Sequence, residues 1–411
     1  MSKKINYSKI NIFISFLIII SFLIGFYFQE NSSGGAIDFK HYYNNFKLFY
    51  GNNFFQVDWF KYESSSLPLY YFVTYFFYNP DNLLLIKIFN LLLSFLCFFI
   101  FYKILKNHLK LTNTLALLLA SSILLSPYFR TSTYWMMEEN FPILMTFLTI
   151  YFFLNMKKKF NYVFLLCAIF FSVCAFFSRQ NYIIISFGLF LLTFDFKNIF
   201  SKKNLLIIFT YAFCFLPSIY FIIAWKGLLP PLLVEQDRTL IFNFKNIPHI
   251  MNILLIYIFP FLYIERKKVL FFFIKNKILI ITLFIFYLLL FYNFIPSNFG
   301  GGAINKLLFM LSSGFVLKYL ILIFSFFSFI LFFTLFRYNK FILIYFGLSI
   351  LLFCTITPVW QEYFDPLSLI FILLFGNKLN SSLNSNRFAY FLIVYLTFFL
   401  SASLFDQKLL T

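Results

Sequence analysis

Acidic residues are scarce in this sequence. Only 14 of its 411 residues are Asp or Glu, against 33 Lys or Arg, and charged residues make up 11% of the chain. Hydrophobic residues make up 62%, whereas an ordinary soluble domain is about a quarter charged and about half apolar. The chain has too few polar side chains to cover the surface of a soluble domain. The composition therefore excludes a soluble protein and predicts an integral membrane protein.

Cysteine is also scarce, and its five copies lack a functional spacing. They are Cys97, Cys167, Cys174, Cys214 and Cys354, all within apolar stretches. Neither the pairing of a disulfide framework nor the spacing of a zinc site is present. In such surroundings a free cysteine behaves as a small hydrophobic residue.

Long apolar runs fill most of the chain. A helix crosses a bilayer with about 20 apolar residues, and about thirteen stretches approach that length. They lie near 10–28, 83–102, 112–127, 141–155, 160–177, 181–194, 204–224, 250–264, 278–295, 316–336, 341–357, 364–376 and 388–404. We expect an all-α polytopic membrane protein with about 11–13 transmembrane helices, forming one membrane domain over residues 1–411. The first stretch is not followed by a small-residue cleavage site, so we expect it to remain as a span.

The basic residues are distributed unevenly between the expected loops. With the N-terminus inside, Lys and Arg gather in loops of one side, for example at 157–159 and 266–268, where the only acids are Asp195 and Glu265. The opposite side carries both signs in near balance. The positive-inside rule accounts for this asymmetry. The net charge of +19 therefore indicates topology and a lipid environment, and we expect no nucleic-acid partner.

The longest outward segment, residues 29–82, follows the first span and contains Asp38, His41 and Asp58. Asp38 and His41 are three positions apart, so in a helix they share one face. Asp38 is a candidate general base; the alternative is an acid that stabilises the start of a helix. The aromatic stretch SLPLYYF at 66–72 predicts a helix that lies in the membrane interface.

Arginines mark the ends of three expected spans on the outward side. Arg130, Arg179 and Arg238 carry the side chain best suited to bidentate phosphate binding. Together they are candidates to hold a lipid-linked phosphate, although each alone also fits a contact with lipid headgroups. Candidate substrate-binding residues in the outward segments are Asp58, Glu138, Glu139, Gln180, Gln361 and Tyr363.

These motifs resemble the GT-C superfamily of multispan glycosyltransferases, whose members take a sugar from a polyprenyl phosphate. An acid or acidic pair in their first outer loop precedes a glycine and a Pro-Leu-Tyr-like entry, which correspond to Asp38, Gly51 and PLYY at 68–71. The stretches at 86–105, 126–151, 176–184 and 235–238 are similar to the α-1,2-glucosyltransferase family that uses dolichyl-phosphate-glucose, and PVWQEYFDP at 358–366 is similar to a late outer motif of other lipid-linked sugar transferases. One departure is Phe39, which leaves a single acid where the family has a pair; an alignment on His41 and Gly51 places Asp38 at the second acid of that pair.

The resemblance implies transfer of a hexose or pentose from a polyprenyl-phosphate-sugar donor to a glycan, lipid or protein acceptor. Asp38, with His41 beside it, would deprotonate the acceptor, while Arg130, Arg179 or Arg238 would hold the departing phosphate. No cofactor is required, and no ligand cluster indicates a divalent cation. The expected location is a bacterial inner membrane with the site facing the periplasm, or the endoplasmic reticulum membrane in a eukaryote.

Two other functions remain open at this point. One is a polysaccharide polymerase or ligase with a lipid-diphosphate donor, whose essential residues would lie in the loop at 226–249. The other is a flippase for lipid-linked sugars, which requires a polar path through the spans. The only ionisable residue near a span interior is Lys87, close to the start of its span, and this disfavours the flippase. Which acid is the base, Asp38, Asp58, Glu138 or Glu139, is also open.

Overall fold

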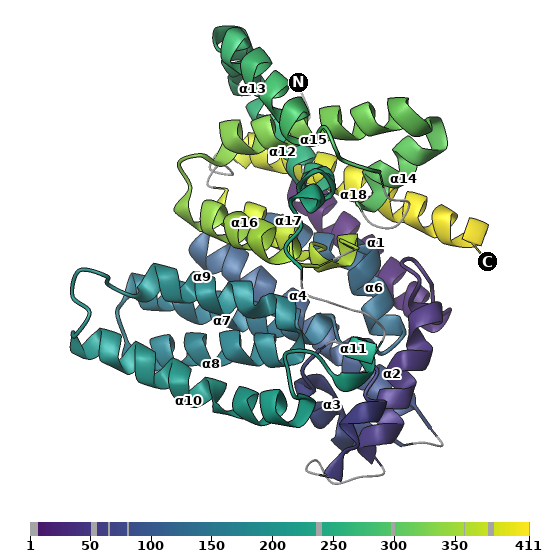
Figure 1. Cartoon of the computed structure of the whole chain (residues 1–411), viewed down its shortest axis with the longest axis vertical. Helices are drawn as coiled ribbons and strands as arrows, with labels where there is room; N and C mark the ends of the chain where they lie inside the picture. The colour runs from purple at the N-terminus through teal and green to yellow at the C-terminus, as the bar shows by residue number, and fades with distance from the viewer. Residues whose placement is uncertain are drawn as a thin grey trace. The chain divides into compact units, whose positions relative to one another are not determined.

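The computed structural model describes residues 7–50, 56–64, 66–79, 82–235, 241–296, 301–356, 358–376 and 382–410. Within these ranges every regular element is a helix, so the expected all-α fold is confirmed. The chain divides into two compact units, Met1–Arg238 with Leu396–Thr411, and Thr239–Tyr395. We call them unit 1 and unit 2 and describe each by itself (Figure 1).

Unit 1 begins with α1 and a group of short helices and continues with a helical bundle. Its elements are α1 (Tyr7–Tyr27), α2 (Gly35–Tyr50), η2 (Trp59–Lys61), α3 (Leu69–Thr74), η3 (Tyr75–Phe77), α4 (Leu84–His108), α5 (Asn113–Ser121), η4 (Ser122–Leu125), α6 (Pro127–Tyr134), α7 (Asn140–Lys158), α8 (Tyr162–Ser178), η5 (Gln180–Tyr182), α9 (Ile183–Thr193), α10 (Lys202–Trp225) and α11 (Pro231–Glu235).

Unit 2 is also helical in the residues that the structure describes. Its elements are η6 (Phe244–Asn246), α12 (Ile247–Lys275), α13 (Lys277–Leu290), α14 (Gly302–Leu311), α15 (Gly314–Phe336), α16 (Lys340–Phe353), η7 (Gln361–Tyr363) and α17 (Leu367–Phe375). The last helix, α18 (Ser382–Leu410), belongs to unit 2 up to Tyr395 and to unit 1 beyond it.

Six helical segments of the described chain are long and apolar enough to cross a membrane, so the protein is a polytopic integral membrane protein. They are Tyr7–Tyr27, Leu84–His108, Lys202–Trp225, Phe244–Lys275, Gly314–Phe336 and Ser385–Asp406. Fewer segments pass this test than the sequence predicts, because several apolar stretches form helices of 10–17 residues, such as Tyr162–Ser178 and Lys277–Leu290. The basic run at 266–268, expected in a loop, lies inside α12.

The span expected at 112–127 ends at a sharp bend. Asn113–Leu125 and Pro127–Tyr134 meet at 69° across a break at Ser126. Pro127 cannot donate a backbone hydrogen bond and restricts the residue before it to extended conformations. Ser126 is extended, and its side chain accepts a hydrogen bond from the Phe129 amide, which starts α6 anew. The sequence SP thus ends one helix and begins the next.

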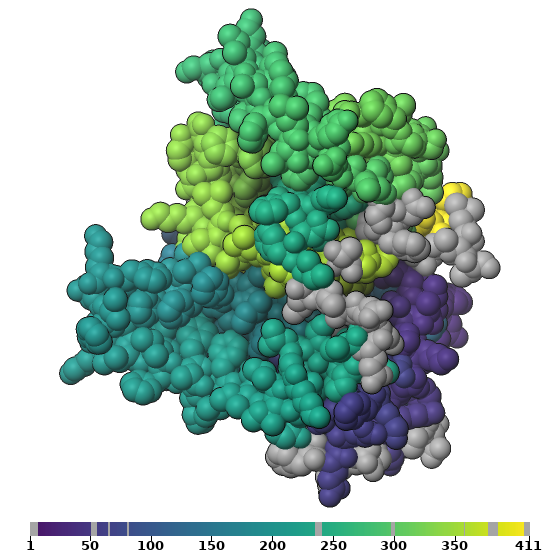
Figure 2. All heavy atoms as spheres, viewed as in Figure 1, coloured from purple at the N-terminus to yellow at the C-terminus, as the bar shows by residue number. Residues whose placement is uncertain are grey.

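Unit 1 places the start of α7 beside the end of α8. The two helices are joined by three residues and pack along each other, with α4 against α7 and α10 against α8 (Figure 1). Only 11% of the apolar window of α10 is buried, and the teal side chains of this region form a continuous part of the face shown in Figure 2. We infer that α10 faces lipid, whereas the start of α7 and the end of α8 are enclosed.

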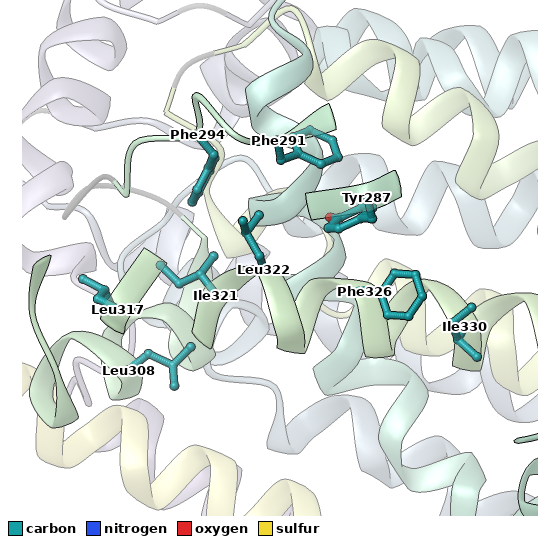
Figure 3. Close-up of a cluster of buried hydrophobic side chains, with 9 residues drawn as sticks. All are labelled: Tyr287, Phe291, Phe294, Leu308, Leu317, Ile321, Leu322, Phe326 and Ile330. Carbon is teal, nitrogen blue, oxygen red and sulfur yellow. The ribbon is translucent and has the colours of Figure 1, made fainter. Parts of the chain in front are cut away.

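Unit 2 is built around the packing of α12 and α15. A buried apolar cluster joins α13, α14 and α15 (Figure 3). Its members are Tyr287, Phe291, Phe294, Leu308, Leu317, Ile321, Leu322, Phe326 and Ile330. The one hydroxyl among them, on Tyr287, shares a 2.8 Å hydrogen bond with Ser325 Oγ, so its polar end is satisfied within the core.

An ion pair fixes the end of α1 to α6 in unit 1. Arg130 Nε and Nη2 contact Glu30 Oε1 and Oε2 at 2.7 and 2.6 Å, and the Arg130 side chain is only 1% exposed. The same guanidinium donates to the carbonyls of Ser21 and Leu124. Gly25 leaves room for it, since a Cβ atom there would lie 2.6 Å from Arg130 Nη2. This contact determines where the polypeptide leaves α1 and starts toward α2.

We expect Arg130→Met to destabilise the protein by about 3–5 kcal/mol, because it leaves the Glu30 carboxylate partly buried without its cation. Thermal denaturation in detergent micelles measures the loss. Adding Glu30→Gln to Arg130→Met should recover much of it, since no charge is then left unpaired. Lys61→Met breaks an exposed ion pair with Asp58 and should cost about 0–1 kcal/mol. Equal losses for the Arg130 and Lys61 variants would contradict this role of the buried pair.

Candidate functional site

Helix α2 is anchored at its start by contacts with α6. Ser32 Oγ donates to the Pro127 carbonyl at 3.0 Å and lies 3.1 Å from Thr131 Oγ1. Gly35 is pressed so closely to α6 that a Cβ atom would lie 2.3 Å from the Thr131 methyl group and 2.9 Å from the Trp135 ring. The first turn of α2, which carries Asp38, is thereby held near the turn between α6 and α7.

The second half of α2 is held by aromatic packing against α3. Phe46 and Phe49 are buried, and the Phe49 ring stacks on Tyr71 at 5.6 Å with an interplanar angle of 6°. Phe46 packs on Tyr70 and Tyr71. The helix expected in SLPLYYF is confirmed as α3, although it starts at Leu69. Its tyrosines pack against α2 and hold in place the helix that carries Asp38.

Asp38 lies half-buried in the first turn of α2. This position agrees with the alternative that the sequence left open, an acid that stabilises the start of a helix. A helix start favours the ionised form, yet the pKa of Asp38 is raised above 3.8. Burial is the main cause, and the negative charge of Glu139 adds to it, while His41 and Arg179 act in the opposite direction. A raised pKa makes a carboxylate a better base near neutral pH.

Glu139 and Arg179 lie at the start of α7 and at the end of α8, and both interact electrostatically with Asp38. Glu139 is the residue before the first turn of α7, and Arg179 follows the last turn of α8, so each charge has the sign that its helix end favours. Their closest approach is 3.5 Å, and Tyr42 Oη donates to the same Glu139 Oε1 at 2.8 Å. The structure therefore brings Asp38, Glu139 and Arg179 together.

Glu138 is buried on the other side of this turn. Ser66 Oγ donates to Glu138 Oε1, and Tyr62 Oη donates to the Ser66 carbonyl at 2.8 Å. Burial raises the pKa of the Tyr62 hydroxyl, and the Glu138 carboxylate raises it further. With the Glu138 side chain only 2% exposed, we assign it to the support of the site.

His41 is tied to a residue of the segment that follows η2. His41 Nδ1 and Glu63 Oε2 are 2.6 Å apart, and Asn44 Nδ2 donates to Glu63 Oε1 at 2.9 Å. The backbone amide of Glu63 donates to Asn45 Oδ1, and Asn45 Nδ2 donates to Tyr71 Oη. Three residues of α2, His41, Asn44 and Asn45, thus hold Glu63. Asp38 interacts electrostatically with His41 on the same side of the helix.

Other predicted residues of unit 1 lie apart from this cluster or outside the described chain. The guanidinium of Arg130 is occupied by Glu30 and two carbonyls, so we no longer place Arg130 at a phosphate. Asp58 caps η2 and pairs with Lys61 on the surface. Gln180, next to Arg179 in the chain, donates to the Leu228 carbonyl. Arg238 and Gly51 lie outside the described residues.

Gln361 and Tyr363 belong to unit 2, where both make packing contacts. Gln361 Oε1 accepts from the Ala303 amide at 2.8 Å at the start of α14, and its Nε2 lies 3.3 Å from Tyr257 Oη. The Tyr363 ring stacks on Phe353 at 5.3 Å. These contacts hold η7 to its neighbours in unit 2.

A buried polar network of unit 2 has no counterpart in the sequence-based prediction. His249 Nδ1 and Asn305 Nδ2 are 2.6 Å apart, and Asn252 Nδ2 donates to Asn305 Oδ1 at 2.8 Å. Gly301 lies over it, because a Cβ atom there would collide with Asn305 and His249. The sequence GGAI occurs at 34–37 and again at 301–304, and a glycine of each copy, Gly35 and Gly301, lies at a close backbone approach.

The sequence-based prediction also missed Glu63, Tyr42 and Ser66 as parts of the site. Glu63 and Ser66 stand 22 and 28 positions after His41 and Asp38, with no periodic relation to them. Tyr42 follows His41 directly in a segment rich in tyrosine, so nothing distinguished it. Only its position four residues after Asp38, on the same helical face, was a signal. Within the described residues no group of three or more His, Cys, Asp or Glu has the geometry to hold a metal ion.

Comparison with known proteins adds no family. No family model matches the sequence, and no curated protein and no solved structure matches it significantly. The resemblance to GT-C glycosyltransferases rests on the sequence motifs alone and is carried forward as a proposal.

The raised pKa of Asp38 has a consequence for stability. The folded state holds this proton more tightly than the unfolded state, so ionisation of Asp38 lowers stability as the pH rises above about 3.8. We expect Asp38→Asn to melt at or above the wild-type temperature at neutral pH, with the difference shrinking toward pH 4. Thermal denaturation in detergent at both pH values measures this.

Asp195 provides a control of opposite sign. Hydrogen bonds from Asn198 and the Lys197 amide lower the pKa of this exposed carboxyl, so its ionised form stabilises the fold above the unfolded pKa and loses that effect as the pH falls. Asp195→Asn should therefore lower the melting temperature at neutral pH. A clear loss of stability at neutral pH in Asp38→Asn would contradict the burial of an ionised Asp38.

Proposed function

We propose that this protein is a membrane glycosyltransferase, which moves a hexose or pentose from a polyprenyl-phosphate carrier to a glycan, lipid or protein acceptor. The observation that carries the proposal is the half-buried Asp38 with a raised pKa, held beside the Glu139–Arg179 pair at the start of the segment after the first span. The sequence likeness to GT-C enzymes supports the same choice.

The proposed reaction is a direct displacement. The Asp38 carboxylate takes the proton of an acceptor hydroxyl, and the oxygen forms a new bond to the anomeric carbon. The bond between that carbon and the phosphate oxygen breaks, and its electron pair leaves with the lipid phosphate. A polyprenyl phosphate is already a good leaving group, so the proposal includes no cofactor. A base of this kind contributes a factor of about 10² to 10⁴ in rate.

Arg179 is the described residue best placed to bind the departing phosphate. Its side chain is 13% exposed, and it interacts electrostatically with Asp38. Its contact with Glu139 is long, at 3.5 Å and through one nitrogen, unlike the bidentate pair of Arg130. A phosphate would form stronger, bidentate hydrogen bonds with the guanidinium. Arg238, which lies outside the described residues, keeps its predicted role in phosphate binding.

The proposed location is the inner membrane of a bacterium with the site toward the periplasm, or the endoplasmic reticulum membrane in a eukaryote. The charge asymmetry of the loops supports it, because the segment with Asp38 falls on the side poor in Lys and Arg.

We expect a strain that lacks the protein to accumulate a cell-envelope glycan, lipid or glycoprotein shortened by one terminal hexose or pentose. Mass spectrometry of the envelope fractions identifies it. Complementation with wild type should restore the missing sugar, whereas Asp38→Asn should reduce transfer about 10²- to 10⁴-fold. Lys61→Met removes an exposed charge of the same segment and serves as the control.

Two outcomes would count against the proposal. An unchanged envelope profile in the strain without the protein would remove glycosyl transfer as the function. Full transfer by a stably inserted Asp38→Asn would leave the activity but exclude Asp38 as the base.

A further inference from the structure

The contact between His41 and Glu63 fixes the proton of the imidazole. A carboxylate only accepts hydrogen bonds, so at the 2.6 Å contact Nδ1 of His41 must be the donor. In the neutral ring the other nitrogen, Nε2, then carries a lone pair and accepts. The His41 side chain is 62% exposed, so this acceptor is open to a ligand.

Glu63 is itself held in place. Asn44 donates to its second carboxylate oxygen at 2.9 Å, and its backbone amide donates to Asn45 at 2.9 Å. Asn45 is buried and bound to Tyr71 of α3. An exposed His–Glu pair on two mobile side chains would have little orienting effect. Here the carboxylate belongs to a network that ends in the aromatic core.

We propose that Glu63 is a positioning residue, which holds His41 with its proton on Nδ1 so that Nε2 accepts a hydrogen bond from an acceptor hydroxyl next to the one that Asp38 deprotonates. This inference rests on the proposed function for the identity of the reaction. It adds a residue to the site and narrows the class of acceptor.

The geometry favours a glycan acceptor over a protein or lipid alcohol. Asp38 and His41 are one helical turn apart on one face of α2, and they interact electrostatically. Each offers an acceptor atom, and a hydroxyl group has only one proton to donate. Two acceptors therefore match two hydroxyl groups of one molecule. Neighbouring hydroxyls are a property of sugars, whereas a serine side chain or a fatty alcohol has one.

The position of the proton is measured without any activity assay. The chain contains three histidines, so ¹⁵N-histidine labelling of the full-length protein in micelles gives few signals, and His41→Gln assigns one. In the neutral form of the ring, we expect His41 to carry its proton on Nδ1. Glu63→Met should shift it toward a mixture, while Glu63→Gln, which keeps an acceptor oxygen, should retain most of the Nδ1–H form. An Nε2–H signal in the wild type, or an unchanged signal in Glu63→Met, would overturn the positioning role.

The role toward the acceptor is measured in membranes that carry each variant. The shortened glycan from the strain without the protein is the acceptor, and its concentration is varied. His41→Gln and Glu63→Met should each raise KM for the glycan about tenfold, as expected for one hydrogen bond, with kcat little changed because Asp38 remains. Removal of the hydroxyl next to the glycosylated one should have the same effect in the wild type and none in His41→Gln. Lys61→Met changes an exposed side chain of the same segment; it is the control and should match the wild type.

The failures can be told apart. If wild-type membranes transfer no sugar to any acceptor, the proposed function is wrong, whatever the NMR signals. If the acceptor is a protein or lipid alcohol without neighbouring hydroxyls, the proposed function stands and the glycan acceptor of this inference is wrong. If the wild type transfers sugar but the His41 and Glu63 variants keep its KM, the function stands and this inference is overturned.

Discussion

The buried pair of Arg130 and Glu30 is the interaction on which the rest of unit 1 depends. Charges inside a membrane protein must be neutralised and hydrogen-bonded where they are removed from water, and Arg130 meets this requirement with one carboxylate and two carbonyls. The pair closes the gap between α1 and α6 five residues before α2 begins. Ser32 and Gly35 then continue the contact along α6, so the position of Asp38 follows from a structural ion pair.

The site contains two charged residues that their helix ends stabilise, Glu139 and Arg179, and one carboxylate whose ionised form its surroundings destabilise, Asp38. Glu139 and Arg179 lie where the ends of α7 and α8 favour them. Asp38 is instead half-buried near the negative charge of Glu139, and both burial and this charge disfavour the ionised form of Asp38. Perturbed carboxylates of this kind are concentrated at functional sites, and the aromatic packing of α2 on α3 stabilises the arrangement.

The fold class could be predicted from the sequence, because a membrane helix is encoded locally by a run of apolar residues. The number of spans could not, since hydropathy does not show how long each helix is: several apolar runs form helices of 10–17 residues, and the basic residues at 266–268 continue α12. In the site, the pairing of Asp38 with His41 could be predicted from the sequence, because their spacing matches one helical turn. Glu63 and Ser66 depend on the path of an irregular segment, which no periodicity encodes, and the pairing of Arg130 with Glu30 depends on the bend before α6.

Because of Gly25, the first helix tolerates amino-acid substitutions at most positions but not at this one. Most side chains of α1 point away from the rest of unit 1, with 28% of its apolar window buried, and one apolar residue can replace another there with little effect on packing. At position 25 even a methyl group would meet Arg130, Tyr134 and Glu30 within 2.8 Å. During evolution α1 is therefore free to drift in sequence along its lipid side while one position stays fixed. A comparison of relatives would find the last turn of α1 marked by a glycine inside an otherwise variable helix.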